Sequence, residues 1–384
     1  MASASASIQS QPVTKSSQSS KLWLRDRRWD LMFISFSVIL VPLPYLIYLL
    51  GVKLGLEPDV SRNAVNGFVA VAVGGPHMMS TFLRTGLDQN FRKSYPMLLR
   101  SSLIIPIIVV SLAFLNLNLL LTIFFFWAAL HVMHQITYIT ELYNHKEHTF
   151  VRPNSSVTPL SRIIDYGVIL TCLFPFAALK ISQGQFDIGT NDLASVIPEF
   201  FQATWFFVLM SGIFITAVTA FLVKSTLEYR AGVLNWPKTI FVSLTVFVAF
   251  IIPSLPNLDT AFQGLNTWHS LQYLAITFYI IGIRAAYRKL DNTAPLVHRF
   301  EKHGSKGLFL LSSIMLVGSI LVFLFVYTIA PIVRPGIDGN QHFDIAYYTA
   351  ILSFLWIHYY HDHFLFTNFE VLDDASYGEK PIIT

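Results

Sequence analysis

Histidines inside apolar stretches are the residues of this chain most able to do chemistry. Seven of the twelve histidines lie where the sequence is otherwise apolar, namely His77, His131, His134, His269, His358, His361 and His363. An ionisable side chain is unfavourable inside a bilayer and by default marks a functional site. Neutral imidazole is a common metal ligand, and ligands that are mostly imidazole suit Zn, Cu, Fe or Ni. The sequence therefore predicts a metal site.

Helical spacing places several of these histidines on shared faces. At about 100° per residue, one face of a helix carries His131, His134, Tyr138, Glu141 and His145, and His148 extends this stripe. Near the C-terminus, another helix face carries His358, His361 and Asp362, while His363 points to the opposite side. Two ligands at i and i+3 can converge on one metal ion.

The expected ligand set follows from these faces. We expect metal ligands at His77, His131, His134, His269, His358 and His361. Further candidate ligands are His145, His148, Asp362 and His363. Tyr138 and Glu141 are the expected catalytic residues, because partners beside a metal ligand orient it.

The elements that position these residues are membrane helices. The chain has 384 residues, of which 54% are hydrophobic and only 12% are charged. A soluble domain has about twice that charged share. The single cysteine, Cys172, excludes a disulfide or a thiolate metal site within one chain. No run of basic residues interleaved with aromatics indicates nucleic-acid binding.

Ten segments are long and apolar enough to cross a hydrocarbon core about 30 Å thick. They are predicted at 31–50, 64–84, 100–116, 118–143, 160–181, 200–223, 237–254, 264–284, 307–333 and 345–366. Lys and Arg gather before the first span and after the second, fourth, sixth and eighth, which puts both termini in the cytoplasm. The prediction is an all-α, polytopic helical bundle over 23–368, with a disordered leader at 1–22 and a cytoplasmic tail at 369–384.

Depth along the helices tests whether the histidines can meet. At about 1.5 Å per residue, His77, His134, His358 and His361 fall at similar depths in the cytoplasmic half of the membrane. His269 falls about 7–10 Å away from them by the same arithmetic. Unless its helix tilts or breaks, His269 is expected to lie outside the ligand group.

Three short motifs carry a family resemblance. They are Gly74-Gly75-Pro76-His77, Trp127-Ala-Ala-Leu-His131-Val-Met-His134 and Trp268-His269-Ser270. Their order resembles that of the Brp/Blh-like membrane β-carotene 15,15′-dioxygenases. The resemblance implies non-haem iron held by His77, His131, His134 and His269, and an O₂-dependent reaction on an isoprenoid or other lipid chain. More loosely, His358-Tyr-Tyr-His361-Asp362-His363 is similar to the histidine boxes of membrane desaturases and hydroxylases.

The functional hypothesis combines the ligands with their setting. We expect a membrane-embedded non-haem iron oxygenase, with one or two iron ions, O₂ and a hydrophobic substrate taken from the bilayer, and carotenoid or isoprenoid cleavage is favoured. One alternative is a di-iron lipid or fatty-acyl desaturase or hydroxylase, which needs an electron-donor protein. Alternatives of another class are a haem-binding electron-transfer protein and a metal or proton transporter.

Overall fold

The structure is a computed structural model that describes residues 22–368 apart from 151–157, 190 and 337–338. Within that part of the chain it is helical almost throughout, and its only β structure is one antiparallel pair of two-residue strands. The predicted all-α class is confirmed. The predicted tail, and the predicted leader except for its last residue, lie outside the described residues.

The first half of the described chain contains thirteen helical elements, counting π-helical and 3₁₀ turns. They are α2 (Arg27–Trp29), η1 (Asp30–Ser35), η2 (Phe36–Leu40), α3 (Pro42–Lys53), α4 (Pro58–Val69), η3 (Ala70–Gly74), α5 (Gly75–Arg84), α6 (Gln89–Ser94), α7 (Pro96–Ser102), α8 (Ile104–Leu115), α9 (Leu117–Phe150), α10 (Pro159–Thr171) and α11 (Phe174–Ser182).

The second half begins with the short strand pair and ends in one long helix. Its elements are β1 (Asp187–Ile188), β2 (Asn191–Asp192), η4 (Ala194–Val196), α12 (Glu199–Gln202), α13 (Thr204–Arg230), α14 (Trp236–Ile251), η5 (Ile252–Ser254), α15 (Leu258–Ala286), α16 (Pro295–Glu301), α17 (Gly304–Met315), α18 (Val317–Val333) and α19 (Gly339–Thr367).

Seven helical stretches of the described chain are long and apolar enough to cross a membrane, and each overlaps one predicted span. They are Arg27–Lys53, Pro96–Leu115, Leu117–Thr149, Pro159–Ser182, Thr204–Arg230, Trp236–Ser254 and Gly304–Val333. The other three predicted spans are also helical, as α4–η3–α5, α15 and α19. These three are less apolar than the seven.

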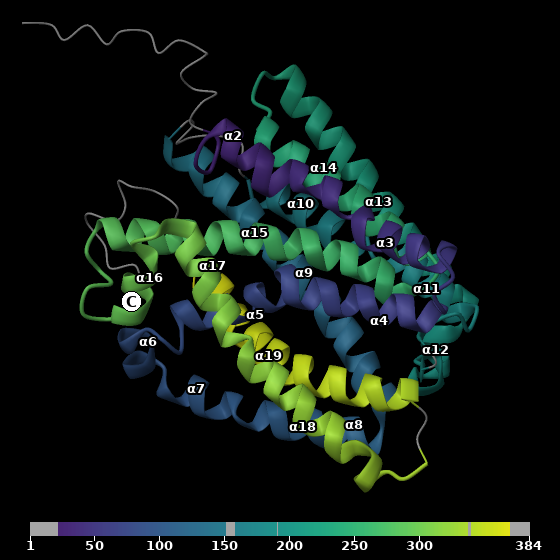
Figure 1. Cartoon of the computed structure of the whole chain (residues 1–384). Helices are drawn as coiled ribbons and strands as arrows, with labels where there is room; N and C mark the ends of the chain where they lie inside the picture. Colours follow the sequence, from purple (N-terminus) through teal and green to yellow (C-terminus); the bar gives the residue numbers. More distant parts are fainter. Residues whose placement is uncertain (1–21, 151–157, 190, 337–338, 369–384) are drawn as a thin grey trace, which may run out of the picture.

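Two of the three less apolar spans, α15 and α19, lie mostly inside the bundle, and in the third the α5 part is buried. In Figure 1, α4 and α15 cross the middle of the molecule, with α7 and α8 along one edge and α13 and α14 along the opposite edge. Most residues of α15 and of α19 are buried. A helix covered by other helices does not need an apolar surface towards lipid. Its buried side can therefore carry the polar groups that lower its hydropathy.

Two local features shape the second predicted span around His77. Pro76 has no backbone N–H to donate, and the helix widens into the π-helical turn η3 just before it. A Cβ atom on Gly75 would meet the Ala70 carbonyl oxygen at 2.5 Å and the Leu316 side chain at 2.6 Å. Gly75 therefore leaves room for the close approach of Leu316, which lies between α17 and α18.

Candidate metal centre

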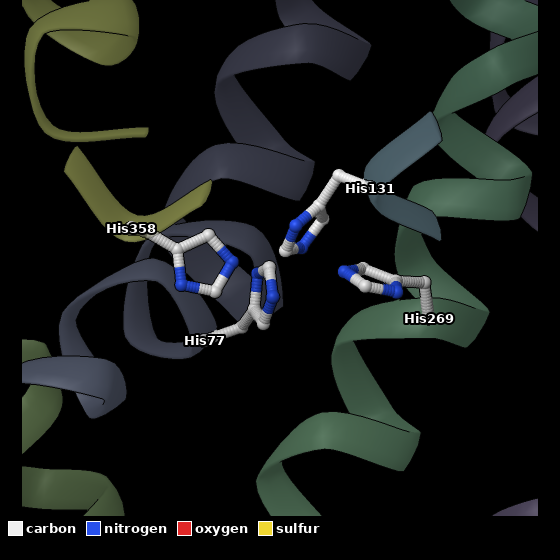
Figure 2. Close-up of side chains that lie close together, drawn as sticks. All are labelled: His77, His131, His269 and His358. Carbon is white, nitrogen blue, oxygen red and sulfur yellow. The ribbon is translucent and has the colours of Figure 1, made fainter. Parts of the chain in front are cut away.

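Four histidines from four separate helices converge in the core of the bundle. His77 comes from α5, His131 from α9, His269 from α15 and His358 from α19 (Figure 2). One ring nitrogen from each lies within 4.8 Å of one from every other. Because no two come from the same helix, the centre forms only when these four helices pack together.

The four rings form a closed square. His77 contacts His358 and His269, with ring centroids 4.4 Å and 4.8 Å away. His131 contacts the same two rings, at 4.8 Å and 5.0 Å. Each of these four contacts is T-shaped, with angles between the ring planes of 64° to 82°, and the four rings surround a common centre (Figure 2).

Burial leaves ring nitrogens of this group without hydrogen-bond partners. The four side chains are between 0% and 4% exposed. Among the described residues, no partner is found for the Nε2 atom of any of the four, or for Nδ1 of His77 and His269. A buried polar atom without a partner is unfavourable and calls for an explanation such as an ion.

A divalent ion fits this arrangement of donors. Imidazole nitrogens bind Zn²⁺ at about 2.0–2.1 Å, which places the nitrogens of a tetrahedral site about 3.4 Å apart. The observed limit of 4.8 Å is wider, so the rings need to move inwards by roughly one ångström. One ring nitrogen from each of the four histidines makes up the four ligands of a tetrahedral site.

A hydrogen-bonded group lies directly behind His358. The Thr81 hydroxyl is 2.5 Å from His358 Nδ1 and donates to Asp362 Oδ1 at 2.9 Å. The Tyr273 hydroxyl donates to the same carboxylate oxygen at 2.7 Å. With Nδ1 held in this way, His358 presents Nε2 to the centre, the usual arrangement in which a carboxylate orients a histidine ligand.

The supporting residues share a spacing that the sequence analysis missed. Each of the four histidines is followed one helical turn later, at i+4, by a polar residue that is buried: Thr81, Gln135, Tyr273 and Asp362. Residues at i and i+4 lie on one face of a helix. Gln135 donates to the His269 carbonyl at 3.1 Å, and the other three bond to one another. Searching each helix for a polar residue four positions after its histidine would have found them.

His361 and Asp362 lie near the four histidines without belonging to the group. His361 is buried, and its Nδ1 atom lies 3.2 Å from the Thr85 hydroxyl. Asp362 supports His358 from behind, with Oδ2 3.5 Å from Nδ1 of that ring. In the structure, His358 and His361 therefore do not converge on one point as predicted.

His134 and His363 pair with each other at a different place. Their ring centroids are 5.0 Å apart, His134 is half-buried and His363 is exposed. Both line a groove of about 590 Å³ between α9, α10 and α19, which we call the lateral groove. Tyr138 also lines it, stacked on Phe366. The groove reaches His131, so it connects the four-histidine centre with the outside of the bundle.

The remaining predicted residues lie farther along α9. Glu141 is ten residues after His131, about 15 Å along the helix, and it pairs with Arg162 at 3.2 Å and accepts from Tyr166. His145 is partly exposed and bonds Thr149, and the His148 side chain is exposed. None of them lies among the four converging histidines.

The expected displacement of His269 is wrong. His269 lies in the middle of α15, whereas His77 lies in the C-terminal third of the continuous stretch α4–η3–α5 and His358 in the C-terminal third of α19. The His269 ring nevertheless contacts both His77 and His131. The depth estimate assumed that the helices end at one level. Since α15 continues well beyond its neighbours at its C-terminal end, counting from helix ends misplaces its residues.

Comparison with protein-family models, with curated proteins and with solved structures finds no match to this chain. The fold and the site together define a class: a helical protein with helices long and apolar enough to cross a membrane and with a buried cluster of four histidines. The function has to be argued from that centre and from the spaces that reach it.

Proposed function

We propose that the protein is a membrane-embedded, histidine-ligated metalloenzyme, specifically a non-haem iron oxygenase acting on a lipophilic substrate. The observation that carries this proposal is the set of four buried histidines whose ring nitrogens converge, each with its Nε2 atom unpartnered among the described residues. Four imidazoles suit Fe, Zn, Cu or Ni. Iron is the proposed ion because the motifs around His77, His131 and His269 resemble those of the membrane carotene dioxygenases.

One ion per chain is the proposed content. The four converging ligands satisfy a single ion, whereas a di-iron centre needs a second group of ligands near the first. Iron supplies activation of O₂, and O₂ itself partitions into lipid. The direct contacts among the four rings argue against a haem at this place, because a macrocycle must separate its axial histidines.

The chain's own residues would position the reactants. The four helices hold the ligands, and Thr81, Asp362 and Tyr273 fix the orientation of His358. The lateral groove is the proposed substrate site, since its volume of about 590 Å³ is within the range of small-molecule sites and it reaches His131 of the four-histidine centre. Trp127, Leu130 and Phe366 give it an apolar and aromatic lining suited to an isoprenoid chain.

The proposed orientation in the membrane follows from the charges of the loops. Ten spans with both termini in the cytoplasm satisfy the positive-inside rule. The seven apolar helices support a membrane location. The three less apolar helices complete the count of ten, and the centre then lies towards the cytoplasmic half.

The test uses purified protein in lipid nanodiscs, loaded with Fe²⁺ and supplied with β-carotene as the first of a panel of lipids. O₂ uptake and product masses are compared for wild type, His269→Ala and His303→Ala, the last being a loop histidine. The proposal predicts metal-dependent O₂ uptake that His269→Ala abolishes and His303→Ala retains. Equal uptake with and without metal would refute it. Turnover that requires added reductant and inserts a double bond or a hydroxyl group would instead support the desaturase or hydroxylase alternative.

A further inference from the structure

A row of polar side chains runs along α15 from its N-terminal end to the metal centre. Asp259, Gln263, Asn266 and His269 follow one another at spacings of four, three and three residues, which places them on one face of the helix. Ten residues of helix separate the two ends of the row by about 15 Å. Polar residues within a membrane helix are uncommon and tend to mark a pathway.

Hydrogen bonds connect the first three members of this row by way of Asn66 and continue to Ser270, the residue after His269. Asn66 of α4 donates to Asp259 at 3.3 Å, and Gln263 donates to Asn66 at 3.0 Å. Asn266 donates to Gln263 at 3.2 Å, and Ser270 donates to Asn266 at 3.5 Å. The chain of bonds therefore runs from a buried carboxylate to the residue next to His269.

A cavity follows the same row. It has a volume of about 60 Å³ and is lined by Asp259, Gln263, Asn266 and His269, together with aromatic side chains such as Tyr347. A water molecule needs about 10–15 Å³ of such volume, so the cavity has room for about four. Asp259 Oδ1 at one end and His269 Nδ1 at the other lack protein partners among the described residues. Water molecules in the cavity would satisfy these atoms.

A cluster of charges lies at the end of the row away from the centre. Arg62, which is 3% exposed, pairs with Asp344 at 3.2 Å, with Asp59 at 3.5 Å and with Asp259 at 3.7 Å. The Asp59 side chain is 29% exposed. The cluster thus connects the buried end of the row with the surface of the bundle.

We propose that this cavity is a hydrated path that carries protons between the Asp59–Asp259 charge cluster and the four-histidine centre. This proposal rests on the proposed function, because the path serves the metal centre. It gives the buried centre an aqueous connection that is separate from the lateral groove. With the topology predicted from the loops, it opens on the side of the membrane opposite the cytoplasm.

The chemistry of the lining assigns the roles. Carboxamides neither release nor take up a proton readily near neutral pH, so Gln263 and Asn266 hold water molecules in place. A proton moves along the path when each water accepts one from its neighbour and passes another on, which leaves every water as it began. At the outer end, the carboxylates exchange protons with bulk water. A lipophilic substrate and its protons therefore reach the centre by different routes.

Two measurements test the path, both on the full chain in nanodiscs loaded with Co²⁺. The first is a cryo-electron microscopy map, in which ordered water is expected between Asp259 and His269. The second is a stopped-flow drop in pH that follows the loss of Co²⁺ absorption, because protons must reach the imidazoles to displace the metal. The variants Asn266→Leu and Gln263→Met keep side-chain volume but remove the groups that hold water. Thr267→Val is the matched control, a polar residue of α15 outside the cavity.

The expected result is a release of Co²⁺ at least tenfold slower in Asn266→Leu and Gln263→Met than in wild type, with equal affinity at neutral pH. Thr267→Val should match wild type. Equal release rates in all four proteins, or a cavity without water in the map, would overturn the path while leaving the metal centre intact. Failure of the wild-type protein to bind Co²⁺ would instead refute the metal centre. The map would still show whether the cavity contains water.

Discussion

Thr81 offers a sharp test of how the centre is held together. Its hydroxyl lies between His358 Nδ1 at 2.5 Å, the Tyr273 hydroxyl at 2.7 Å and Asp362 Oδ1 at 2.9 Å. Thr81→Val replaces this hydroxyl by a methyl group of similar size. The substitution therefore removes the link between His358 and the Asp362 carboxylate without opening a cavity.

The size of the effect follows from the bonds that are lost. Asp362 keeps the bond from Tyr273, so the variant loses one charge-assisted hydrogen bond and leaves His358 Nδ1 without its nearest partner. We expect about 2–3 kcal/mol lower stability from these losses. Loss of a residue that orients a metal ligand lowers affinity about 10–100-fold, which corresponds to roughly 1.4–2.8 kcal/mol of binding free energy.

Chelator competition on the purified protein measures the dissociation constant for Fe²⁺ or Co²⁺. The matched control is Thr85→Val, because Thr85 lies one turn later on the same chain and bonds His361, which is outside the four ligands. The control should bind metal like wild type. A folded Thr81→Val protein with a dissociation constant within a factor of two of wild type would refute the orienting role.

Three further predictions concern packing, charge and the ligand set. Gly75→Ala should lower stability by about 1–3 kcal/mol, because its new Cβ would lie 2.5 Å from a backbone oxygen. The control Gly67→Ala should leave stability unchanged, because nothing lies within 4 Å of the added atom. Thermal unfolding measures the stability of both variants. Arg62→Met should lower stability by about 3–5 kcal/mol, because it removes the positive charge that pairs with buried carboxylates. The control Arg25→Met removes an exposed ion pair and should change the melting temperature little. His134→Ala should retain bound metal, because His134 faces the lateral groove. If His134→Ala lost as much metal as a single substitution of one of the four converging histidines, His134 would be a ligand.

The sequence is sufficient to predict the helices of this fold, because long apolar runs and their flanking charges are local properties. The turn between the third and fourth spans also follows locally, since α8 ends at Leu115 and the Asn116 side chain accepts from Leu119 at the start of α9. Two of the three least apolar predicted spans, α15 and α19, are helices of the interior. Their low hydropathy comes from the same polar residues that build the site.

The candidate site could be predicted only in part. Intramembrane placement singled out all four converging histidines, His77, His131, His269 and His358. Spacing along one helix could not show which of two histidines three residues apart faces the core. His134 and His131 were therefore both predicted as metal ligands. The offset between helix ends is a property of tertiary packing, and it is the reason that His269 joins the group despite the depth estimate.

Metal content is the most direct test of the central claim. Elemental analysis with an absorption spectrum, on protein purified in lipid without added chelator, should find one non-haem metal ion per chain and no Soret band. Single substitutions of His77, His131, His269 or His358 by Ala should each remove most of that metal, while His303→Ala keeps it. Protein without metal that also fails to bind added Fe²⁺, or four variants that all retain metal, would contradict the account.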